Sequence, residues 1–536
     1  MPPKHHPVAS DYELLLPRHS LDDKEQEANI HADRRSPSWL STLRITDLFD
    51  RAVYAHYVTP RRRKRSVLRL VYWSIFSIPY FLVFLVLFVA VFFPSYTVRP
   101  PHYNLLRQRA LESDAPGRAN PYQEKVFITA ALYEEKGNLA SGAWGKAVLQ
   151  LIDLLGPEHV HLSIYEDNPD LETKQALVEF RDKVPSNSTI VSEELHLAQL
   201  PHTKLPNGEE RLKRIAFLAQ VRNRALEPID KHGVKFDKVL FLNDVIFDPI
   251  DAVQLLFATN IDSNGRANYA GACAVDFINP FKFYDRFATV GFNTELTGIP
   301  FFPWFTNALG ATSRQDVLAG TDAVRVRSCW GGMVAYEARW FQQHSALDQP
   351  AIQPASVKPN TTAYNDYLRN SPLRFRYANA TFWESSECCL INADLQYRET
   401  GKALPSENRI FMNPYIRVAY DERTLSWLSI TRRPERLYSW VHDILNQIVG
   451  MPSAAARNHE EVGDVVTDKW WQYDDPVRGF ASNATNEDYS GYWKEVTRIA
   501  EPGGWCGGNN LLVINEKPEH GEGKWSKIWP PHPPAH

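Results

Sequence analysis

The chain has 536 residues, with 59 lysines and arginines against 63 aspartates and glutamates, which gives a net charge of −4. Hydrophobic residues make up 44% and charged residues 23%, the range of ordinary globular proteins, and this excludes a wholly disordered chain. The acidic balance, with only one short basic cluster, argues against a nucleic-acid-binding protein, and a single long apolar segment excludes a transporter with many spans.

An uninterrupted apolar segment extends from residue 70 to residue 93 and carries no charged side chain. About 20 such residues are enough to cross a bilayer as a helix. The segment begins far from Met1 and no small-residue cleavage site follows it, which argues against a cleaved signal peptide. We therefore predict a transmembrane helix at 70–93, with a buried core helix as the alternative.

Basic residues flank this segment mainly on its N-terminal side, where RRRKR occupies 61–65. Lysine and arginine are retained on the cytoplasmic side of membranes. The prediction is a single-pass, type II signal anchor: residues 1–69 form a largely disordered cytoplasmic tail, and the rest lies in the lumen of the Golgi or another secretory-pathway compartment. Residues 94–122, rich in proline, arginine and asparagine, are predicted to be a lumenal stem.

Glycosylation sequons and cysteines all follow the apolar segment. The N-x-S/T sequons stand at Asn187, Asn360, Asn379 and Asn483. An oxidising lumen permits disulfides, and five cysteines leave at least one thiol free or paired between chains. The adjacent Cys388 and Cys389 fit no zinc-binding spacing, so no metal site of cysteines is predicted.

An alternation of strand and helix patterns begins near residue 124. Strands are predicted at 125–133, 159–168 and 238–247, and helices at 141–155, 171–184 and 211–226. This order is typical of a parallel α/β sheet with helices on both faces. We assign this domain to residues 123–500, and we interpret residues 501–536, rich in glycine, proline and tryptophan, as a loop-like C-terminal extension.

Acidic and amide side chains follow the predicted strands. They are Glu134 and Glu135 after the first strand, Glu166, Asp167 and Asn168 at the end of the second, and Asn243 and Asp244 in the third. Ligands of parallel α/β sheets bind at the carboxyl ends of the strands. No G-x-G-x-x-G or Walker A motif follows any of these strands, which argues against a nicotinamide or ATP site.

Asp244 is the candidate metal ligand. A buried strand that brings this carboxylate to the edge of the sheet is typical of sugar-nucleotide transferases, in which a divalent cation bridges carboxylate and diphosphate. The usual form is Asp-x-Asp, whereas this triplet is Asn243-Asp244-Val245. An aspartate of the same segment that caps a helix beginning at Pro249 is the alternative, and spacing does not choose between the two.

The predicted helix at 211–226 carries several cationic side chains. Arg214 or Arg222 could pair with a diphosphate, because the helix directly precedes the acidic strand. A solvated cationic face is the alternative.

Two later segments add candidates. SCWGGMVAY (328–336) places two glycines where a loop must approach a ligand closely, with a simple turn as the alternative. FWESSECCLINADL (382–395) brings together the carboxylates of Glu384, Glu387 and Asp394. A pair of carboxylates is also compatible with a glycosidase or with ordinary surface acids. No Ser-His-Asp arrangement or nucleophile elbow is present.

Six segments in order resemble one known family. They are AQVRNRALEP, VLFLNDVIFDPIDAVQLL, GACAVDF, SCWGGMVAYEARWF, SSECCLINADL and NPYIRVAYD. As a set, over residues 123–430, they are similar to the fungal capsule-associated mannosyltransferases, the cryptococcal alpha-1,3-mannosyltransferase family (glycosyltransferase family 69). The resemblance implies a GT-A-like fold, GDP-mannose as donor and a divalent cation, with Mn²⁺ the first expectation. It also implies transfer, with retention, to an alpha-mannoside acceptor in a mannan or other mannose-containing glycan.

The resemblance also implies roles for individual residues. Asp244 would hold the metal; Arg222, Asn223 and Asn243 would bind the donor; Trp330, Gly331 and Gly332 would form the acceptor-side loop; and Glu387 and Asp276 would be the catalytic candidates. Glu134 and Glu166 are added to the predicted donor-binding residues because they lie at the carboxyl ends of predicted strands. Two other readings stay open. One is a transferase for another nucleotide sugar, and the other is a non-catalytic, membrane-anchored protein of polysaccharide export or carbohydrate binding.

Overall fold

The computed structural model describes residues 67–134, 136–205, 209–231, 233–301, 304–307, 311–342, 372–451, 455, 457–473, 491–516 and 523–530. Residues 1–66 of the predicted cytoplasmic tail, which include the RRRKR cluster, and the sequons at Asn360 and Asn483 lie outside these residues. The described chain falls into two units, one ending at Phe88 and one beginning at Val89.

The apolar segment forms one continuous helix, α4 (Val67–Phe92), with Pro79 inside it. Within α4, residues Arg69–Phe92 are long and apolar enough to cross a membrane, and almost all of their side chains are exposed. The predicted helix is therefore present, and its apolar side chains are not part of a core in the described chain.

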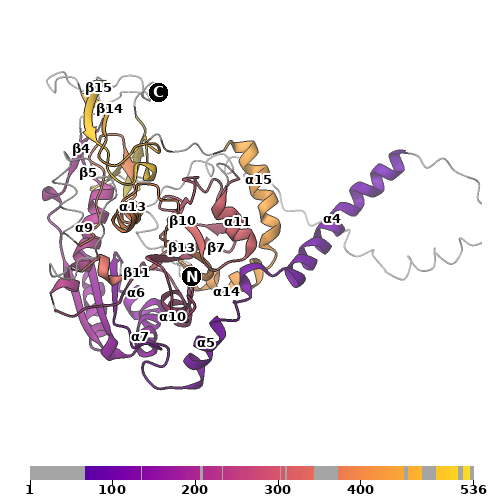
Figure 1. The fold of residues 1–536 in the computed structure, drawn as a ribbon, viewed down its shortest axis with the longest axis horizontal. Coiled ribbons are helices and arrows are strands. Elements are labelled where there is room, and N and C mark those ends of the chain that lie inside the picture. Colours follow the sequence, from indigo (N-terminus) through magenta and orange to yellow (C-terminus); the bar gives the residue numbers. More distant parts are fainter. Residues whose placement is uncertain are drawn as a thin grey trace, which may run out of the picture. The chain divides into compact units, whose positions relative to one another are not determined.

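A large mixed sheet organises the second unit (Figure 1). Its strand order is β3 (Asn187–Glu193), β2 (Val160–Asp167), β1 (Val126–Leu132), β6 (Lys238–Leu242), β11 (Met333–Glu337), β7 (Gly271–Asn279), β13 (Ile410–Ala419), β10 (Val324–Ser328) and β9 (Val290–Gly291), with β8 (Lys282–Phe283) paired to β7. The first four of these strands are parallel, and β11 is antiparallel to β6. Because Met333 of β11 pairs with Leu242 of β6, β11 begins at the edge where the parallel strands end.

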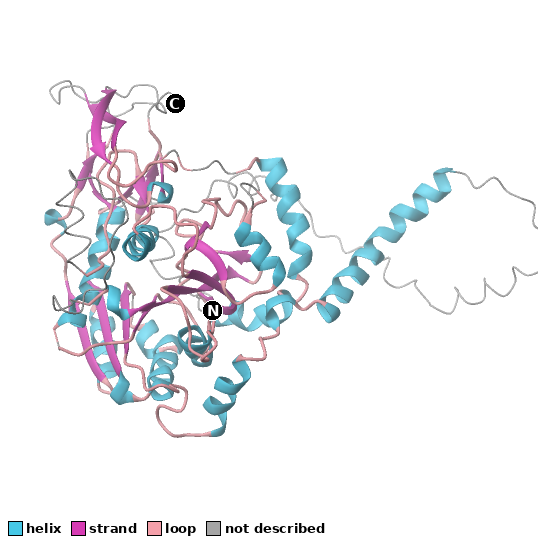
Figure 2. Ribbon diagram, viewed as in Figure 1, coloured by secondary structure: helices cyan, strands magenta, loops and turns pink. Residues whose placement is uncertain are grey.

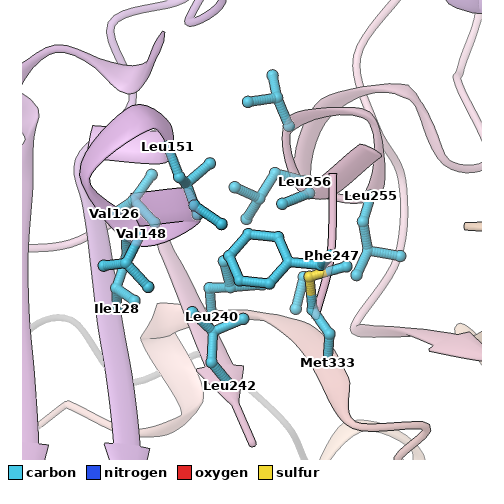
Figure 3. Close-up of a cluster of buried hydrophobic side chains, with 14 of the residues drawn as sticks. Val126, Ile128, Val148, Leu151, Leu240, Leu242, Phe247, Leu255, Leu256 and Met333 are labelled. Atoms are coloured by element: carbon cyan, nitrogen blue, oxygen red, sulfur yellow. The ribbon is translucent and has the colours of Figure 1, made fainter. Parts of the chain in front are cut away.

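Helices cover both faces of this sheet, which confirms the predicted α/β class. The helices of the second unit are α5 (Tyr103–Glu112), α6 (Asn138–Ser141), α7 (Ala143–Leu155), α8 (Leu171–Arg181), α9 (Arg214–Leu226), α10 (Pro249–Ala258), α11 (Thr312–Ala319), α13 (Glu387–Thr400), α14 (Glu422–Thr431) and α15 (Tyr438–Val449). Side chains alternate between the faces along each strand. Val126 and Ile128 of β1 accordingly pack against α7 and α10 (Figure 3), whereas Phe127 belongs to the core on the side of α9 and α13.

Smaller sheets extend the second unit. They are formed by β4 (His202–Lys204), β5 (Glu210–Lys213), β17 (Leu511–Ile514) and β18 (Trp525–Ile528); by β12 (Glu384–Ser385) and β16 (Gly507–Gly508); and by the hairpin of β14 (Val465–Tyr473) and β15 (Gly491–Ile499). Figure 2 shows the β14–β15 hairpin apart from the large sheet.

Three local predictions differ from the structure. The predicted helix at 211–226 begins only at Arg214, because residues 210–213 form β5 and pair with β4 and β17. The segment 94–122 is not a free stem throughout, because α5 inserts Tyr103 and Leu106 into the core under α10. The C-terminal segment is less loop-like than its composition indicates, because the apolar run at 511–514 forms the buried strand β17.

Candidate functional site

A pocket opens where the parallel strands end and β11 begins. Of the predicted site residues, Arg222, Asn243, Asp276, Trp330 and Glu387 line it. These five side chains come from α9, the segment after β6, β7, the loop before β11 and the first turn of α13. The tertiary structure therefore brings together residues that lie as far as 165 positions apart in the sequence.

Asn243 joins several elements at the base of this pocket. Its side-chain oxygen accepts hydrogen bonds from Trp330 Nε1 (3.1 Å) and from Arg222 Nη1 (3.4 Å). Its backbone N–H donates to the carbonyl of Gly332, and its own carbonyl accepts from Trp144 Nε1 of α7 (2.9 Å each). Asn243, which stands where the usual motif has its first aspartate, therefore connects α7, α9 and the loop before β11 by hydrogen bonds.

Arg222 and Glu387 form a buried ion pair inside the pocket. Arg222 Nε donates to Glu387 Oε1 at 3.1 Å, and both side chains are more than nine-tenths buried. The guanidinium also lies over the Trp330 ring, 4.4 Å from its centroid. The thiol of Cys388, 3.4 Å away, is a second donor to the same carboxylate oxygen. Glu387 is therefore held in one orientation, with its charge balanced by Arg222.

The loop before β11 depends on its two glycines. Gly331 and Gly332 have φ of +57° and +69°, and a Cβ on Gly331 would lie 2.0 Å from the carbonyl oxygen of Ala274. The Gly331 N–H donates to Asp285 Oδ2 at 3.0 Å. Asp285 lines the pocket but was not among the predicted site residues, because it lies in an aromatic-rich loop without a recognisable motif.

Asp276 lies behind this loop on β7. Its carboxylate accepts hydrogen bonds from the backbone N–H of Asp285 (3.1 Å) and from the hydroxyl of Tyr420 (2.9 Å). Burial, and then the charge of Asp285, raise the pKa of Asp276 to about 8. These contacts suit a residue that positions the loop of Asp285 better than one that exchanges protons.

The remaining acids of the sheet edge have different surroundings. Glu134 binds the N-terminus of α6, because its carboxylate accepts from the backbone N–H groups of Leu139 and Ala140. Glu166 is fully buried and accepts one hydrogen bond, from the backbone of Glu134. Burial, with the nearby charges of Glu134, Asp167 and Asp244, raises the pKa of Glu166 to about 9. Asp244 is also buried, so two carboxyl groups lie near one another after β2 and β6.

Asp248, and not Asp244, caps the following helix. Its Oδ1 accepts from the backbone N–H of Ile250 at 2.9 Å, at the N-terminus of α10. The two interpretations of this segment therefore concern different aspartates, because the helix cap is Asp248 and not Asp244.

Arg214, the first residue of α9, adds a second cation to the pocket lining. Its side chain is almost completely buried, and neither Nε nor Nη1 has a hydrogen-bond partner among the described residues. The indole of Trp525 lies 5.1 Å from the guanidinium carbon. Burial lowers the pKa of Arg214 to about 10, so the group is still charged at neutral pH.

Asn223 does not line the pocket. Its amide exchanges two hydrogen bonds of 2.8 Å with the backbone N–H and carbonyl of Phe375. Since Phe375 packs against Trp330, Asn223 supports the pocket from behind.

The three acids of segment 382–395 do not act as a set. Glu384 pairs with Lys213 (3.2 Å), Glu387 with Arg222 and Asp394 with Arg376 (2.8 Å). In a glycosidase the two catalytic carboxyl groups face each other across one bond of the substrate. Here each of the three acids forms its own ion pair with a different base, and this arrangement does not resemble such a catalytic pair.

The segment of the chain that builds this pocket matches a known protein family. The family described as cryptococcal mannosyltransferase 1 matches residues 125–394, half of the chain, from β1 into α13. The chain belongs to this mannosyltransferase family. The predicted family is thereby confirmed, and the matched segment contains every residue that lines the pocket except Tyr420.

The solved structures that resemble this chain are distant in sequence. No curated protein matches it significantly. The solved structure of the mannosyltransferase PcManGT from Pyrobaculum calidifontis, in complex with GDP-Man and Mn²⁺, is 10% identical over 66% of this chain and 72% of that chain, with a TM-score of 0.29. TarS from S. aureus is 11% identical over 55% of this chain and 36% of that chain, with a TM-score of 0.27. The assignment rests on the family match.

The carboxyl groups of Asp244 and Glu166 are oxygen ligands of the kind that a divalent cation bound to a nucleotide requires. No three His, Cys, Asp or Glu side chains form a ready-made metal site in the described part of the chain. A nucleotide-bound cation needs only one or two carboxylates, because phosphate oxygens and water supply the other ligands. The charge of buried Asp244 contributes to the raised pKa of Glu166, whose Oε2 has no hydrogen-bond partner among the described residues, so these two acids are the candidates for that role.

Cysteines and sequons of this family member agree with an oxidising compartment. Cys273 is bonded to Cys329, and Cys389 to Cys506, which leaves a buried thiol at Cys388. The described sequon asparagines, Asn187 and Asn379, are both exposed. Exposure is what attachment of a glycan requires.

Replacement of Gly331 by alanine is expected to distort the loop that carries Trp330. A left-handed alanine costs about 1–2 kcal/mol, and the contact with the Ala274 carbonyl adds to that cost. Thermal unfolding should show a larger loss for Gly331→Ala than for the control Gly233→Ala, because Gly233 has a similar φ of +63° but open space around it. Equal losses in the two variants would contradict a tightly packed loop.

Raising the pH from about 5 to 8 is expected to destabilise the protein through Glu384. Burial raises the pKa of Glu384 from 4.5 to about 7, against the lowering effects of Lys213 and Arg214. Between these two pKa values the folded chain holds a proton that the unfolded chain has released, so stability falls by about 1.4 kcal/mol per pH unit until the pH reaches the folded-state pKa, and it levels off above that pH. Thermal unfolding across this range should show a shallower slope for Glu384→Gln, and an unchanged slope would contradict the assignment.

Proposed function

We propose that this protein is a GT-A-like, type II membrane mannosyltransferase that moves mannose from GDP-mannose to an alpha-mannoside, with retention and with a divalent cation. The support for mannosyl transfer is the family match over the residues that build the pocket. The observation that carries the choice of site is the pairing of Arg222 and Glu387 in the pocket that Arg214 also lines, where Nε and Nη1 of Arg214 have no hydrogen-bond partner among the described residues.

The donor diphosphate binds on the cationic side of the pocket. Arg214 offers N–H groups without partners among the described residues, and Arg222, about two turns further along α9, lines the same pocket. Guanidinium groups suit phosphate oxygens because their N–H groups form a planar fork. Asp244, with Glu166 beside it, would hold the divalent cation, and a bound cation would neutralise charge on the diphosphate.

Glu387 faces the sugar that is transferred. Departure of GDP leaves positive charge on the anomeric carbon, and a fixed carboxylate nearby stabilises that charge. Arg222 holds Glu387 in place. The loop of Trp330 to Gly332 forms the acceptor side, supported by Asp285 and, behind it, by Asp276.

The membrane anchor is α4, and the domain that follows it is lumenal. The length and apolar character of α4, the basic residues before it and the disulfides after it support this topology. Alpha-1,3 linkage and a Golgi location are proposed from the family resemblance and from this topology.

The test is transfer by the full chain in detergent or nanodiscs. The chain is incubated with GDP-mannose and a mannobiose acceptor, with Mn²⁺ or with EDTA, and released GDP and the product linkage are measured. We expect an alpha-1,3-linked product that requires the metal. Transfer only from another nucleotide sugar would overturn the donor, and binding of glycans without any transfer would favour the non-catalytic alternative.

Replacement of Arg214 by methionine is expected to raise the KM for the donor about 10- to 100-fold, which is the value of one or two charge-assisted hydrogen bonds. Stability should be unchanged or higher, because a buried charge that lacks hydrogen-bond partners for Nε and Nη1 among the described residues is replaced by an apolar side chain of similar length. The control is Arg376→Met, which breaks the pair with Asp394 and should lower stability without changing the KM. A destabilised Arg214→Met protein with an unchanged KM would contradict the role in donor binding.

A further inference from the structure

Helix α15 has the reverse of the usual amphipathic pattern. Its buried side chains are polar, namely Ser439, His442 and Asn446, whereas its apolar side chains are exposed. Helices at the surface of water-soluble domains turn their apolar stripe to the core. The orientation of α15 therefore exposes apolar surface that a helix in water would bury.

Specific contacts hold α15 in this orientation. Asn446 Oδ1 accepts from the backbone N–H of Ile299, and His442 contacts the carbonyl of Thr297. Arg314 of α11 forms an ion pair with Asp443 at 2.9 Å. These polar groups lie on the inner side of α15, so rotation of the helix would leave them without their partners.

Exposed apolar side chains occur on α14, on α15 and in the β7–β8 turn, and we refer to them together as the α14–α15 apolar face. Its members are Phe281, Trp427, Ile430, Trp440, Val441, Ile444, Ile448 and Val449. Trp440 is 64% and Ile444 61% exposed. Phe281 joins the group through Tyr438, with ring centroids 6.5 Å apart. Large exposed apolar patches mark sites that contact another apolar phase or partner.

The end of the membrane helix contacts the segment that connects α14 to α15. The second unit includes the last residues of α4 from Val89 on, and Arg433, just after α14, donates from Nε to the carbonyl of Ala90 at 2.9 Å. Tyr96 then enters the core, where its hydroxyl donates to the Val317 carbonyl at 2.9 Å. The four residues from the end of α4 to Tyr96 span about 14 Å at most, so no flexible stem separates this part of the domain from the end of the apolar helix.

We propose that the α14–α15 apolar face lies in the lumenal membrane interface, beside the point where α4 leaves the bilayer. The inference goes beyond sugar transfer and rests on the proposed anchor. Tryptophan side chains favour the headgroup region, and a helix that lies in the interface buries its apolar side among the acyl chains. The domain is thus held to the bilayer at two places, and its orientation relative to the membrane is restricted.

The test places an environment-sensitive fluorophore on this face of the full chain in nanodiscs. Ile444→Cys is labelled with NBD, and Leu171→Cys on α8, where the parent side chain is 83% exposed, is the matched control. Cys388 is buried, so the unlabelled thiol of the parent chain gives a low background. Both replaced side chains are exposed, and an unchanged proteolysis pattern confirms that each variant is folded.

We expect the label at position 444 to emit at shorter wavelength than the label at 171 and to lose intensity when the lipids carry a nitroxide near the headgroup. Identical emission at the two positions, without nitroxide quenching, would overturn the proposal. A blue shift without nitroxide quenching would mean that a protein, such as a second copy, covers the face, and would also overturn it. A chain that fails to enter nanodiscs would overturn the anchor and this inference together. None of these readouts depends on sugar transfer.

Discussion

Replacement of Asp244 by asparagine is expected to abolish mannosyl transfer. Asparagine keeps the size of the side chain but removes the charge that would hold a divalent cation against the diphosphate. A cation contributes several kcal/mol to charge stabilisation, so turnover should fall on the order of 10³-fold or more, since 1.36 kcal/mol is tenfold in rate. The measurement is GDP released from GDP-mannose as a function of Mn²⁺ concentration.

The matched control for this prediction is Asp248→Asn. Asp248 lies in the same segment and caps α10, and asparagine is an equally good cap. The control should therefore keep both its stability and its metal dependence. If Asp244→Asn retained turnover with the Mn²⁺ dependence of the parent, the metal ligand would have to be sought elsewhere along the sheet edge.

Replacement of Glu387 by glutamine is expected to lower turnover by roughly 10²- to 10³-fold, the loss seen when one group that stabilises transition-state charge is removed. The glutamine carbonyl can still accept the hydrogen bond from Arg222, so the pocket should keep its shape. Donor binding should survive, because the lost charge faces the sugar and not the diphosphate. The measurement is a separation of kcat from the dissociation constant for GDP-mannose.

Glu384→Gln is the control for Glu387→Gln. Glu384 is also a buried acid paired with a base, but its partner is Lys213, and it does not line the pocket. Its replacement should leave kcat unchanged. Loss of donor binding together with turnover in Glu387→Gln would show that the carboxylate maintains the pocket, and its assignment to the transferred sugar would then be wrong.

Much of the fold follows from local patterns. Val126 to Leu132 and Val160 to Asp167 are continuous apolar or buried runs, and the helix at 143–155 carries its apolar side chains at helical spacing and ends at Gly156. Such periodicity depends on neighbours along the chain and is visible in one sequence. The strands at the C-terminus were missed because β17 is short and is stabilised by pairing with β5, about 300 residues earlier.

The candidate site was predicted only in part. Arg222, Glu387 and Trp330 were predicted because they lie in recognisable segments of the family, and the structure brings them together in the pocket. Asp244 stays a prediction, because it is not among the residues that line this pocket. Asp285 was missed because no motif surrounds it, although its carboxylate holds the Gly331 N–H. Asn223 and Glu134 were placed at the donor, but the structure engages their side chains with the backbone of Phe375 and with α6.

The sequence by itself determined the α/β class, the long apolar helix, the family and the acids at the edge of the sheet. Each of these depends on residue type and on spacing over a few turns or strands. Only the tertiary structure decided which base holds Glu387, that Arg214 is buried without a hydrogen-bond partner for two of its nitrogens in the described chain, and that α15 turns its apolar side outward. Those features arise from contacts between distant segments, and the free energy of burying or pairing a charge depends on what surrounds it in space.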